Sequence, residues 1–239
     1  MLEEAFPLNK RSCAFLDVDG TLLKGFIIQS FPRFLADNGF IDVTYPDRID
    51  KIVSDYHSGR ASYRAVAEAI PSLYASALKG RAVNDIKKSA NRFMKAYLPE
   101  HLFHFTESLV RRVSEIVDVT ITISGSPLEV VEELKVWGFD KIFGSIFEER
   151  LGVYTGGVLT NLILGEEKAK FAMKICKEMG IDLSKSLAFG DTDQDEPLLR
   201  MVGLPVAVNP NKKLQEICAL QDWRRLEEDL SNLPRSKGV

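Results

Sequence analysis

The sequence is poor in cysteine, with only Cys13, Cys176 and Cys218, and no two of them form a CxxC pair. This scarcity argues against both a disulfide framework and a thiolate zinc site. Cys13 lies within an apolar segment, and we interpret it as a small core residue. Unpaired cysteines are typical of a reducing compartment, so we expect a cytoplasmic protein.

Excess positive charge is also absent, because 31 Lys and Arg stand against 34 Asp and Glu, for a formal net charge of −3. The basic pairs are scattered along the chain, so we expect no nucleic-acid partner. No apolar run is long enough to cross a bilayer, and residues 1–4 are acidic and begin no apolar signal segment. We therefore expect no membrane association.

Histidine is scarce as well, and His57, His101 and His104 show no ligand spacing with nearby carboxylates, so we interpret them as surface or packing residues. With 239 residues, 45% hydrophobic and 27% charged, the composition is that of a globular protein. This length suits one large domain, or a core with a smaller insertion. We expect a monomer or a homodimer.

Short apolar or β-branched segments predict the strands. They lie at 12–16, 118–124, 186–190 and 205–208, with a short pair at 142–147 and 153–159. Helical spacing of apolar residues predicts the helices. These are 26–38 (interrupted by Pro32), the stretch 46–98, 99–113 (opened by Pro99), 127–137, 166–179, a helix through Met201, and 212–220. The polar tail, 229–239, is expected to fray.

Strands that alternate with helices indicate an α/β fold with a doubly wound, mostly parallel sheet. The helical stretch between the first two strands is too long for a crossover connection. We interpret it as an inserted all-helical cap domain at residues 25–98, with the catalytic core at 1–24 plus 99–239.

Polar side chains follow three of the predicted strands: Asp17 and Asp19, then Ser124 and Gly125, then Asp191 and Asp195. In an open parallel sheet these strand ends meet at one edge, where ligands bind. Taken alone, the first pair could equally form an Asx turn. Acidic clusters from separate strands repel unless a cation lies between them, and an all-oxygen donor set suits Mg²⁺.

Two further features would serve an anionic ligand at this edge. Ser124 and the Gly125 amide, at the start of a predicted helix, offer a hydroxyl and backbone N–H groups. Lys168 lies in the first turn of its helix, where the helix dipole disfavours a cation. A solvated lysine is the alternative interpretation of Lys168.

The order of these motifs resembles the haloacid dehalogenase-like superfamily. Asp17-Val-Asp-Gly-Thr21, Ser124-Gly125, Lys168 and Gly190-Asp-Thr-Asp-Gln-Asp195 follow one another as the four motifs of that family do. The likeness covers most of the chain outside the inserted helices. It is greatest to the phosphoserine phosphatase-like branch, which has a helical cap between the first two motifs.

The resemblance implies a role for each residue. Asp17 would be the nucleophile that forms an aspartyl-phosphate, and Asp19 the general acid and base. Gly20, Thr21, Ser124, Gly125 and Lys168 would bind the phosphate, with Lys168 also offsetting charge. Asp17, the Asp19 carbonyl and Asp191 would hold Mg²⁺, while Asp195 would ligate it through water or orient Lys168. Asp193 is interpreted as a turn residue.

The sequence departs from phosphoserine phosphatases at Phe26. In those enzymes the same position, nine residues past the nucleophile, is a glutamate that resembles a clamp on the substrate's amino group. Gly20 replaces a serine found in many of them. These departures argue against phosphoserine as the substrate, and Phe26 would either face the leaving group or pack the cap. Arg33, Arg60 and Arg64 could contact a second anionic group, but we interpret them as solvated.

The expected function is therefore Mg²⁺-dependent hydrolysis of a small phosphorylated metabolite. Transfer of the phosphoryl group to an alcohol or within a sugar phosphate is an alternative that uses the same aspartyl-phosphate. A non-enzymatic phospho-receiver or metal-binding protein is a further alternative, although receivers usually lack a cap of this length.

Overall fold

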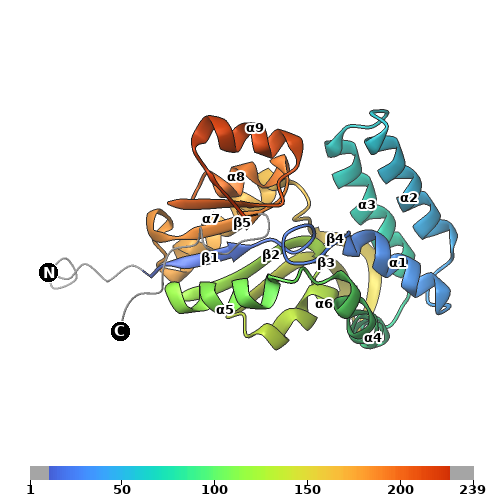
Figure 1. Ribbon diagram of the computed structural model, residues 1–239. Helices are drawn as coiled ribbons and strands as arrows, with labels where there is room; N and C mark the ends of the chain where they lie inside the picture. Colours follow the sequence, from blue (N-terminus) through green and yellow to red (C-terminus); the bar gives the residue numbers. More distant parts are fainter. Residues whose placement is uncertain (1–10, 227–239) are drawn as a thin grey trace, which may run out of the picture.

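The computed structural model describes residues 11–226, in which a seven-stranded sheet has the order β4-β3-β2-β1-β5-β6-β7 (Figure 1). The strands are β1 (Cys13–Leu16), β2 (Val119–Pro127), β3 (Lys141–Arg150), β4 (Val153–Thr160), β5 (Leu187–Gly190), β6 (Leu204–Val208) and β7 (Arg224–Leu226). All neighbouring pairs are parallel except β3 and β4. The predicted doubly wound, mostly parallel sheet is confirmed. The predicted tail, 229–239, and the acidic start, 1–4, lie outside the described residues.

Strand β1 is the centre of the sheet because it pairs with β2 on one side and β5 on the other. All four of its side chains are buried. Cys13 and Phe15 join the hydrophobic cluster on one face, and Ala14 and Leu16 join that on the other. A strand covered on both faces is a continuous apolar run.

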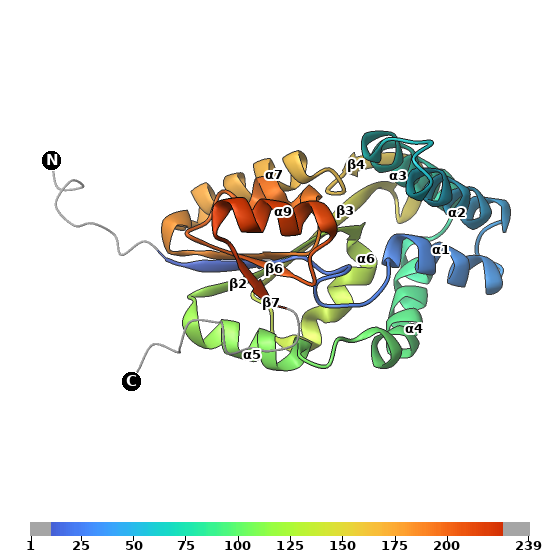
Figure 2. The same cartoon turned by 45° about the horizontal axis from the view of Figure 1, so that its top comes forward.

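Helices cover both faces of the sheet, with α7 and α9 on one side and α5 on the other (Figure 2). The helices that follow β2 in the chain are α6 (Leu128–Val131), η1 (Glu132–Trp137), α7 (Gly165–Met179), η2 (Leu183–Lys185), η3 (Asp193–Asp195), α8 (Glu196–Leu199) and α9 (Lys212–Gln221), where η denotes a 3₁₀ helix. Between β1 and β2 lie α1 (Ile27–Asp37), α2 (Thr44–His57), α3 (Tyr63–Leu78), α4 (Val83–His101) and α5 (Thr106–Ile116). Helices α1–α4, here called the inserted helices, lie beyond one end of the sheet (Figure 1).

Two predictions about proline were wrong. Pro32 does not interrupt α1, and Pro99 does not open a new helix, since it lies in the last turn of α4. Packing compensates for the backbone hydrogen bond that each proline removes. Pro32 is itself buried, and the end of α4 is fixed because the Lys24 N–H donates to the His101 carbonyl at 2.6 Å.

The strand boundaries also differ from prediction at two places. Strand β2 continues to Pro127, so the predicted helix 127–137 begins one residue later and is a single α-turn followed by the 3₁₀ helix η1. Strand β7 was missed, because only Leu226 of its three residues is buried and two exposed arginines carry no apolar pattern. The division into domains at 24/25 and 98/99 stays a prediction.

A buried carboxyl group joins the inserted helices to the core. Glu129 of α6 is 6% exposed, and its Oε1 accepts a hydrogen bond from the Tyr74 hydroxyl of α3 at 2.9 Å. Burial raises the pKa of Glu129 to about 7 from its ordinary value of 4.5. The folded state therefore favours the protonated form of this side chain.

We expect Glu129 to make the free energy of unfolding fall as pH rises. Its contribution is fully present below pH 4.5, is lost between pH 4.5 and about pH 7, and is then constant. The loss amounts to about 3 kcal/mol, at 1.36 kcal/mol per pKa unit. Glu129→Gln should be more stable than the parent at pH 8, by an amount that shrinks towards pH 4.5, in urea unfolding across that range. Glu107→Gln, at an exposed position of α5, is the matched control, and an equal pH slope in parent and Glu129→Gln would contradict the assignment.

Candidate active site

Three neighbouring strands carry the predicted site residues to one edge of the sheet. Asp17 follows β1, and its N–H donates to the carbonyl of Phe189 in β5 at 3.1 Å. Asp191 directly follows β5, and Ser124 and Gly125 lie near the end of β2. The chain leaves β1 for β2 and β3, and later returns to β5 and β6 on the other side. The strand order therefore reverses at β1, which is where open α/β sheets bind ligands.

Lys168 joins two of these carboxylates. Its Nζ is 2.9 Å from Asp17 Oδ1 and 2.8 Å from Asp195 Oδ1, and all three side chains are at most 8% exposed. Burial disfavours the ammonium, but the two carboxylates outweigh it and raise the pKa of Lys168 above its ordinary value. Lys168 is thus a buried, paired cation, and the solvated alternative is excluded.

The close approach of helix α7 to the loop after β5 requires Gly165. A Cβ atom on Gly165 would lie 1.6 Å from the Gln194 carbonyl oxygen, a contact that no side chain permits. Glycine at the start of α7 therefore allows Lys168, one turn later, to reach the carboxylates.

Three carboxyl groups form a cluster that could hold a metal ion. Asp17, Asp191 and Asp195 each offer an oxygen within 4.8 Å of the others. Burial, followed by repulsion between the carboxylates, raises the pKa of Asp191 well above its ordinary value, and burial likewise raises that of Asp17. A Cβ on Gly20 (φ +79°) would lie 2.0 Å from Asp191 Oδ2, so glycine leaves the space that this carboxylate fills.

Asp195 also shapes the loop that carries Asp191. Its Oδ2 accepts hydrogen bonds from the N–H groups of Asp191 and Thr192, both at 3.2 Å. The Thr21 hydroxyl donates to Asp191 Oδ1 at 3.3 Å. Thr21, predicted to bind phosphate, is fully buried against this carboxylate, and neither Gly20 nor Thr21 lines the cleft described below.

Asp19 stands apart from the cluster. Its Oδ1 accepts the Ile27 N–H at 2.7 Å, and its Oδ2 accepts the Ser126 hydroxyl at 2.6 Å and, weakly, that of Ser124 at 3.4 Å. Burial raises the pKa of Asp19, although these donors oppose the shift. Asp17 is held by a cation while Asp19 is held by neutral donors, so the two carboxyl groups are fitted for different tasks.

Ser124 lies deeper than its predicted role requires. It is fully buried, and its Oγ accepts the Ser126 N–H at 3.0 Å. Gly125 and Ser126 line the cleft, and Ser124 does not. The prediction that Ser124 and Gly125 lie at the start of a helix was wrong, because β2 continues to Pro127 and the α-turn that follows has only four residues.

A cleft of about 470 Å³ lies between these carboxylates and the inserted helices. Asp17, Asp19, Lys168, Asp191 and Asp195 line its core side. Its other side comes from the segment before α1 and from helices α1 to α3, and it includes Phe26, Tyr56 and Tyr63. Phe26 is 46% exposed, so its ring is available to a bound molecule.

The arginines of the inserted helices are engaged with carboxylates outside this cleft. Arg33 is 2.8 Å from Asp47 and 2.7 Å from Asp50, and Arg60 is 2.7 Å from Asp55. None of Arg33, Arg60 and Arg64 lines the cleft. Arg64 lies 3.8 Å from Glu68 and 3.6 Å from Glu166.

Among the residues that line the cleft and that sequence reasoning missed are Ser126, Tyr63, Asn211 and His57. The Tyr63 hydroxyl donates to the Ile163 carbonyl at 2.9 Å, which ties α3 to the segment before α7. Asn211 caps α9 and donates from Nδ2 to Asp193 Oδ1 at 2.9 Å. Only Ser126 carried a usable signal, as a second hydroxyl two residues from Ser124. The interpretation of His57 as a plain surface residue was incomplete.

His101 and His104 pack against aromatic rings, as predicted. The His101 ring stacks on Tyr97 at 3.6 Å between centroids, and His104 meets the edge of Phe105 at 5.5 Å. Neither lines the cleft.

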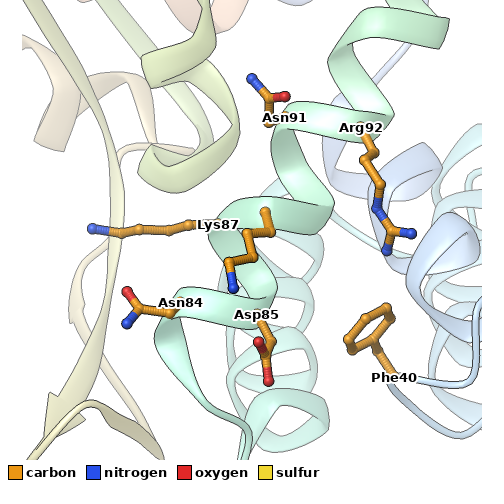
Figure 3. Close-up of a pocket in the computed structure, with 7 residues that line it drawn as sticks. Phe40, Asn84, Asp85, Lys87, Asn91 and Arg92 are labelled. Atoms are coloured by element: carbon orange, nitrogen blue, oxygen red, sulfur yellow. The ribbon is translucent and has the colours of Figure 1, made fainter.

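A larger hollow, of about 680 Å³, lies on α4, away from all of these carboxylates (Figure 3). Lys87, Asn91 and Arg92 border it, and Arg92 lies 5.8 Å from the centre of the Phe40 ring. Its lining holds no buried carboxylate and no cation bonded to one. Volume alone therefore does not identify the functional site, which the chemistry of the buried groups places in the smaller cleft.

The sequence matches the profile of haloacid dehalogenase-like hydrolases over residues 14–200. A histidinol-phosphatase of Neisseria meningitidis is 25% identical over 219 residues, which cover 89% of this chain and 97% of that protein. A phosphoserine phosphatase of Mycobacterium tuberculosis is 24% identical over 221 residues, which cover 91% of this chain and 71% of that protein.

Solved structures share the fold. A Bordetella pertussis protein of unknown function has a TM-score of 0.77 at 24% identity, over 91% of this chain and 98% of that one. A phosphoserine phosphatase solved as a phospho-aspartyl intermediate analogue has a TM-score of 0.65 at 21% identity, over 92% and 94% of the two chains. At these identities the likeness establishes the fold alone.

Proposed function

Because this chain belongs to the haloacid dehalogenase-like hydrolase family, we propose that it hydrolyses a small phosphomonoester through an aspartyl-phosphate on Asp17, with Mg²⁺ as cofactor. The observation that carries the proposal is the buried Lys168, bonded to Asp17 Oδ1 at 2.9 Å, beside a separately held Asp19. The relatives named as phosphatases support the same reaction class.

The first step joins Asp17 to phosphorus. An Asp17 carboxylate oxygen attacks the phosphorus atom, and the bond from phosphorus to the leaving oxygen breaks. Lys168 holds Asp17 Oδ1, which fixes the orientation of the nucleophile and offsets negative charge as the phosphoryl group arrives. The raised pKa of Asp19 favours the carboxylic acid, which donates its proton to the leaving alkoxide.

The second step reverses the role of Asp19. Now a carboxylate, it takes a proton from a water molecule that attacks phosphorus, and the bond from Asp17 to phosphorus breaks. Inorganic phosphate leaves, and Asp17 is again a free carboxylate. Hydrogen bonds from the Ile27 N–H and the Ser126 hydroxyl hold Asp19 in one position in both steps.

The residues present fit a magnesium ion. The cluster of Asp17, Asp191 and Asp195 offers only oxygen donors, and within residues 11–226 a single cation, Lys168, is bonded to it. Burial raises the pKa values of Asp17 and Asp191, and repulsion between the carboxylates adds to this effect; a second cation would relieve the repulsion. Asp17 and Asp191 would hold Mg²⁺, which when bound supplies positive charge to the phosphate oxygens.

We expect removal of divalent cations to abolish hydrolysis of an aryl phosphate, with activity restored by added Mg²⁺. The measurement is the release of inorganic phosphate with and without EDTA, followed by back-titration with Mg²⁺, with Ca²⁺ as a control of different coordination geometry. Full activity in excess EDTA would contradict the metal assignment.

Added acceptor alcohols distinguish hydrolysis from phosphoryl transfer through the products formed, and a stable phosphoprotein without turnover would indicate a receiver.

The partner proposed for this site is a small phosphorylated metabolite. No helix within residues 11–226 has the length and apolar character needed to cross a membrane. The cytoplasmic location, the absence of a nucleic-acid partner and the state of monomer or homodimer stay predictions.

A further inference from the structure

The part of the cleft that would surround the leaving group has no carboxylate, lysine or arginine and is largely apolar. From the segment before α1 and from α1 to α3, its lining includes Phe26, Ile28, Val53, Tyr56, Val66 and Ile70. The polar contributions from these elements are Gln29, His57 and Tyr63, and no aspartate, glutamate, lysine or arginine of the inserted helices lines the cleft. The charged lining groups all belong to the core.

Phe26 lines the same cleft as Asp19 and directly precedes a residue that holds Asp19 in place. The Ile27 N–H, one residue on, donates to Asp19 Oδ1 at 2.7 Å, and Asp19 is the group that would protonate that oxygen. Phe26 is 46% exposed although it is a large apolar side chain. An apolar leaving group would cover this ring and bury area that water now contacts.

On α2, the carboxylates that flank the lining residues Val53 and Tyr56 are already paired with cations. On α2, Asp50 accepts from Arg33 at 2.7 Å, and Asp55 accepts from Arg60 at 2.7 Å and from Lys51 at 3.1 Å. A substrate ammonium group would therefore have to displace an arginine to gain a partner on this helix.

Apart from Asp19 and the cluster of Asp17, Asp191 and Asp195, one more acidic residue of the core, Asp193, lines the cleft. Its carboxylate also has hydrogen-bond partners. Its Oδ1 accepts from Asn211 at 2.9 Å and its Oδ2 from Gln194 at 3.0 Å, with Lys213 Nζ at 3.6 Å. A substrate carboxylate, conversely, would enter a cleft whose core side already carries Asp17, Asp19, Asp191 and Asp195 against Lys168. Burying either charge without a partner is costly.

We propose that the substrate's leaving group is an uncharged aromatic or branched aliphatic alcohol that packs on Phe26, Val53 and Tyr56, and that zwitterionic amino-alcohol phosphates are rejected. The proposal rests on the proposed phosphatase function and specifies its substrate class. The cleft volume of about 470 Å³ lies in the range that holds a small ligand. His57 and Gln29 leave room for an uncharged polar substituent at the rim.

The test compares three primary-alkyl monoesters of similar intrinsic reactivity: benzyl phosphate, O-phosphoethanolamine and O-phosphoserine. We expect kcat/KM for benzyl phosphate to exceed that for either substrate with an ammonium group by roughly 100-fold. Benzyl phosphate buries more apolar area and leaves no ammonium group without a partner. A kcat/KM for O-phosphoserine or O-phosphoethanolamine equal to or above that for benzyl phosphate would overturn the inference and leave the phosphatase function standing. Hydrolysis of none of the three would overturn both.

Two variants test whether the residues that line the cleft on the side of the inserted helices determine the substrate preference. Phe26→Ala should lower kcat/KM for benzyl phosphate more than for O-phosphoethanolamine. Val53→Asp should lower the ratio of kcat/KM for benzyl phosphate to kcat/KM for O-phosphoethanolamine about 10-fold or more, because it supplies a carboxylate for the ammonium group. Val136→Asp makes the same change at a 70% exposed position of η1, outside the cleft, and should leave the ratio unchanged. If this ratio of kcat/KM values were equal in the Val53→Asp and Val136→Asp variants, the proposed role of the lining residues would be contradicted.

Discussion

We expect Asp17→Asn to reduce turnover of any phosphomonoester by roughly 10⁴-fold or more, because the amide cannot attack phosphorus and form the aspartyl-phosphate. Lys168 keeps its second bond, to Asp195 at 2.8 Å, so the fold around the site persists. The measurement is kcat with an aryl phosphate at saturating Mg²⁺. A cooperative thermal transition close to that of the parent shows that the loss is chemical.

Asp193→Asn is the matched control for this prediction. Asp193 lies in the same cleft, but its carboxylate bonds to Asn211 and Gln194 and is not part of the cluster of Asp17, Asp191 and Asp195. We expect a loss within about 10-fold, which is below the roughly 10²- to 10⁴-fold that a general acid or base contributes. Activity of the Asp17 variant near that of the Asp193 variant would mean that another group attacks phosphorus.

We expect Lys168→Met to lower both activity and stability. Loss of a cation that orients the nucleophile and offsets phosphate charge should reduce kcat between about 100-fold and 1,000-fold. Without bound metal, Asp17 and Asp195 are then buried with no cationic partner, and breaking a buried ion pair from one side costs about 3–5 kcal/mol. Urea unfolding in EDTA near neutral pH measures this loss.

Lys170→Met controls for the loss of a lysine from the same helix. Lys170 is exposed and its Nζ is 2.8 Å from Glu167, so we expect this solvated pair to add little to stability and its removal to leave turnover unchanged. Equal destabilisation of the two variants would contradict the view that Lys168 holds the carboxylates together.

The convergence of Asp17 and Asp191 could be predicted from the sequence because it follows from topology. Parallel strands present their carboxyl ends at one edge, and the resemblance supplied the order of the motifs. Lys168 in particular was ambiguous until its helix was placed, since one residue pattern fits both a solvated and a buried lysine. Its burial depends on the contact that Gly165 permits with Gln194, which joins segments distant in sequence.

The position of Ser126 could not be predicted in the same way. Strand periodicity assigns side chains to faces only while the register is regular. The pairing of β2 with β3 shifts between Ile123 and Pro127, within the segment that holds both serines. The faces of Ser124 and Ser126 are therefore set by this irregularity, and local pattern does not determine which hydroxyl meets the cleft.

The helix ends around Pro32 and Pro99 illustrate a different limit. Proline is a local signal for the end of a helix, and it predicted breaks that tertiary contacts override. Tyr97, two residues before Pro99, is buried and its hydroxyl donates to the Lys24 carbonyl at 3.1 Å, so the last turn of α4 is held by a segment that is distant in sequence.

The central claim is a covalent phosphoryl group on Asp17. Acid quenching of the enzyme during turnover of a labelled phosphomonoester with Mg²⁺, followed by peptide mapping, tests it most directly. We expect a hydroxylamine-sensitive label on the peptide that contains Asp17, and none in the Asp17→Asn variant. Rapid release of phosphate with no label on the protein, or a label on another residue, would contradict it.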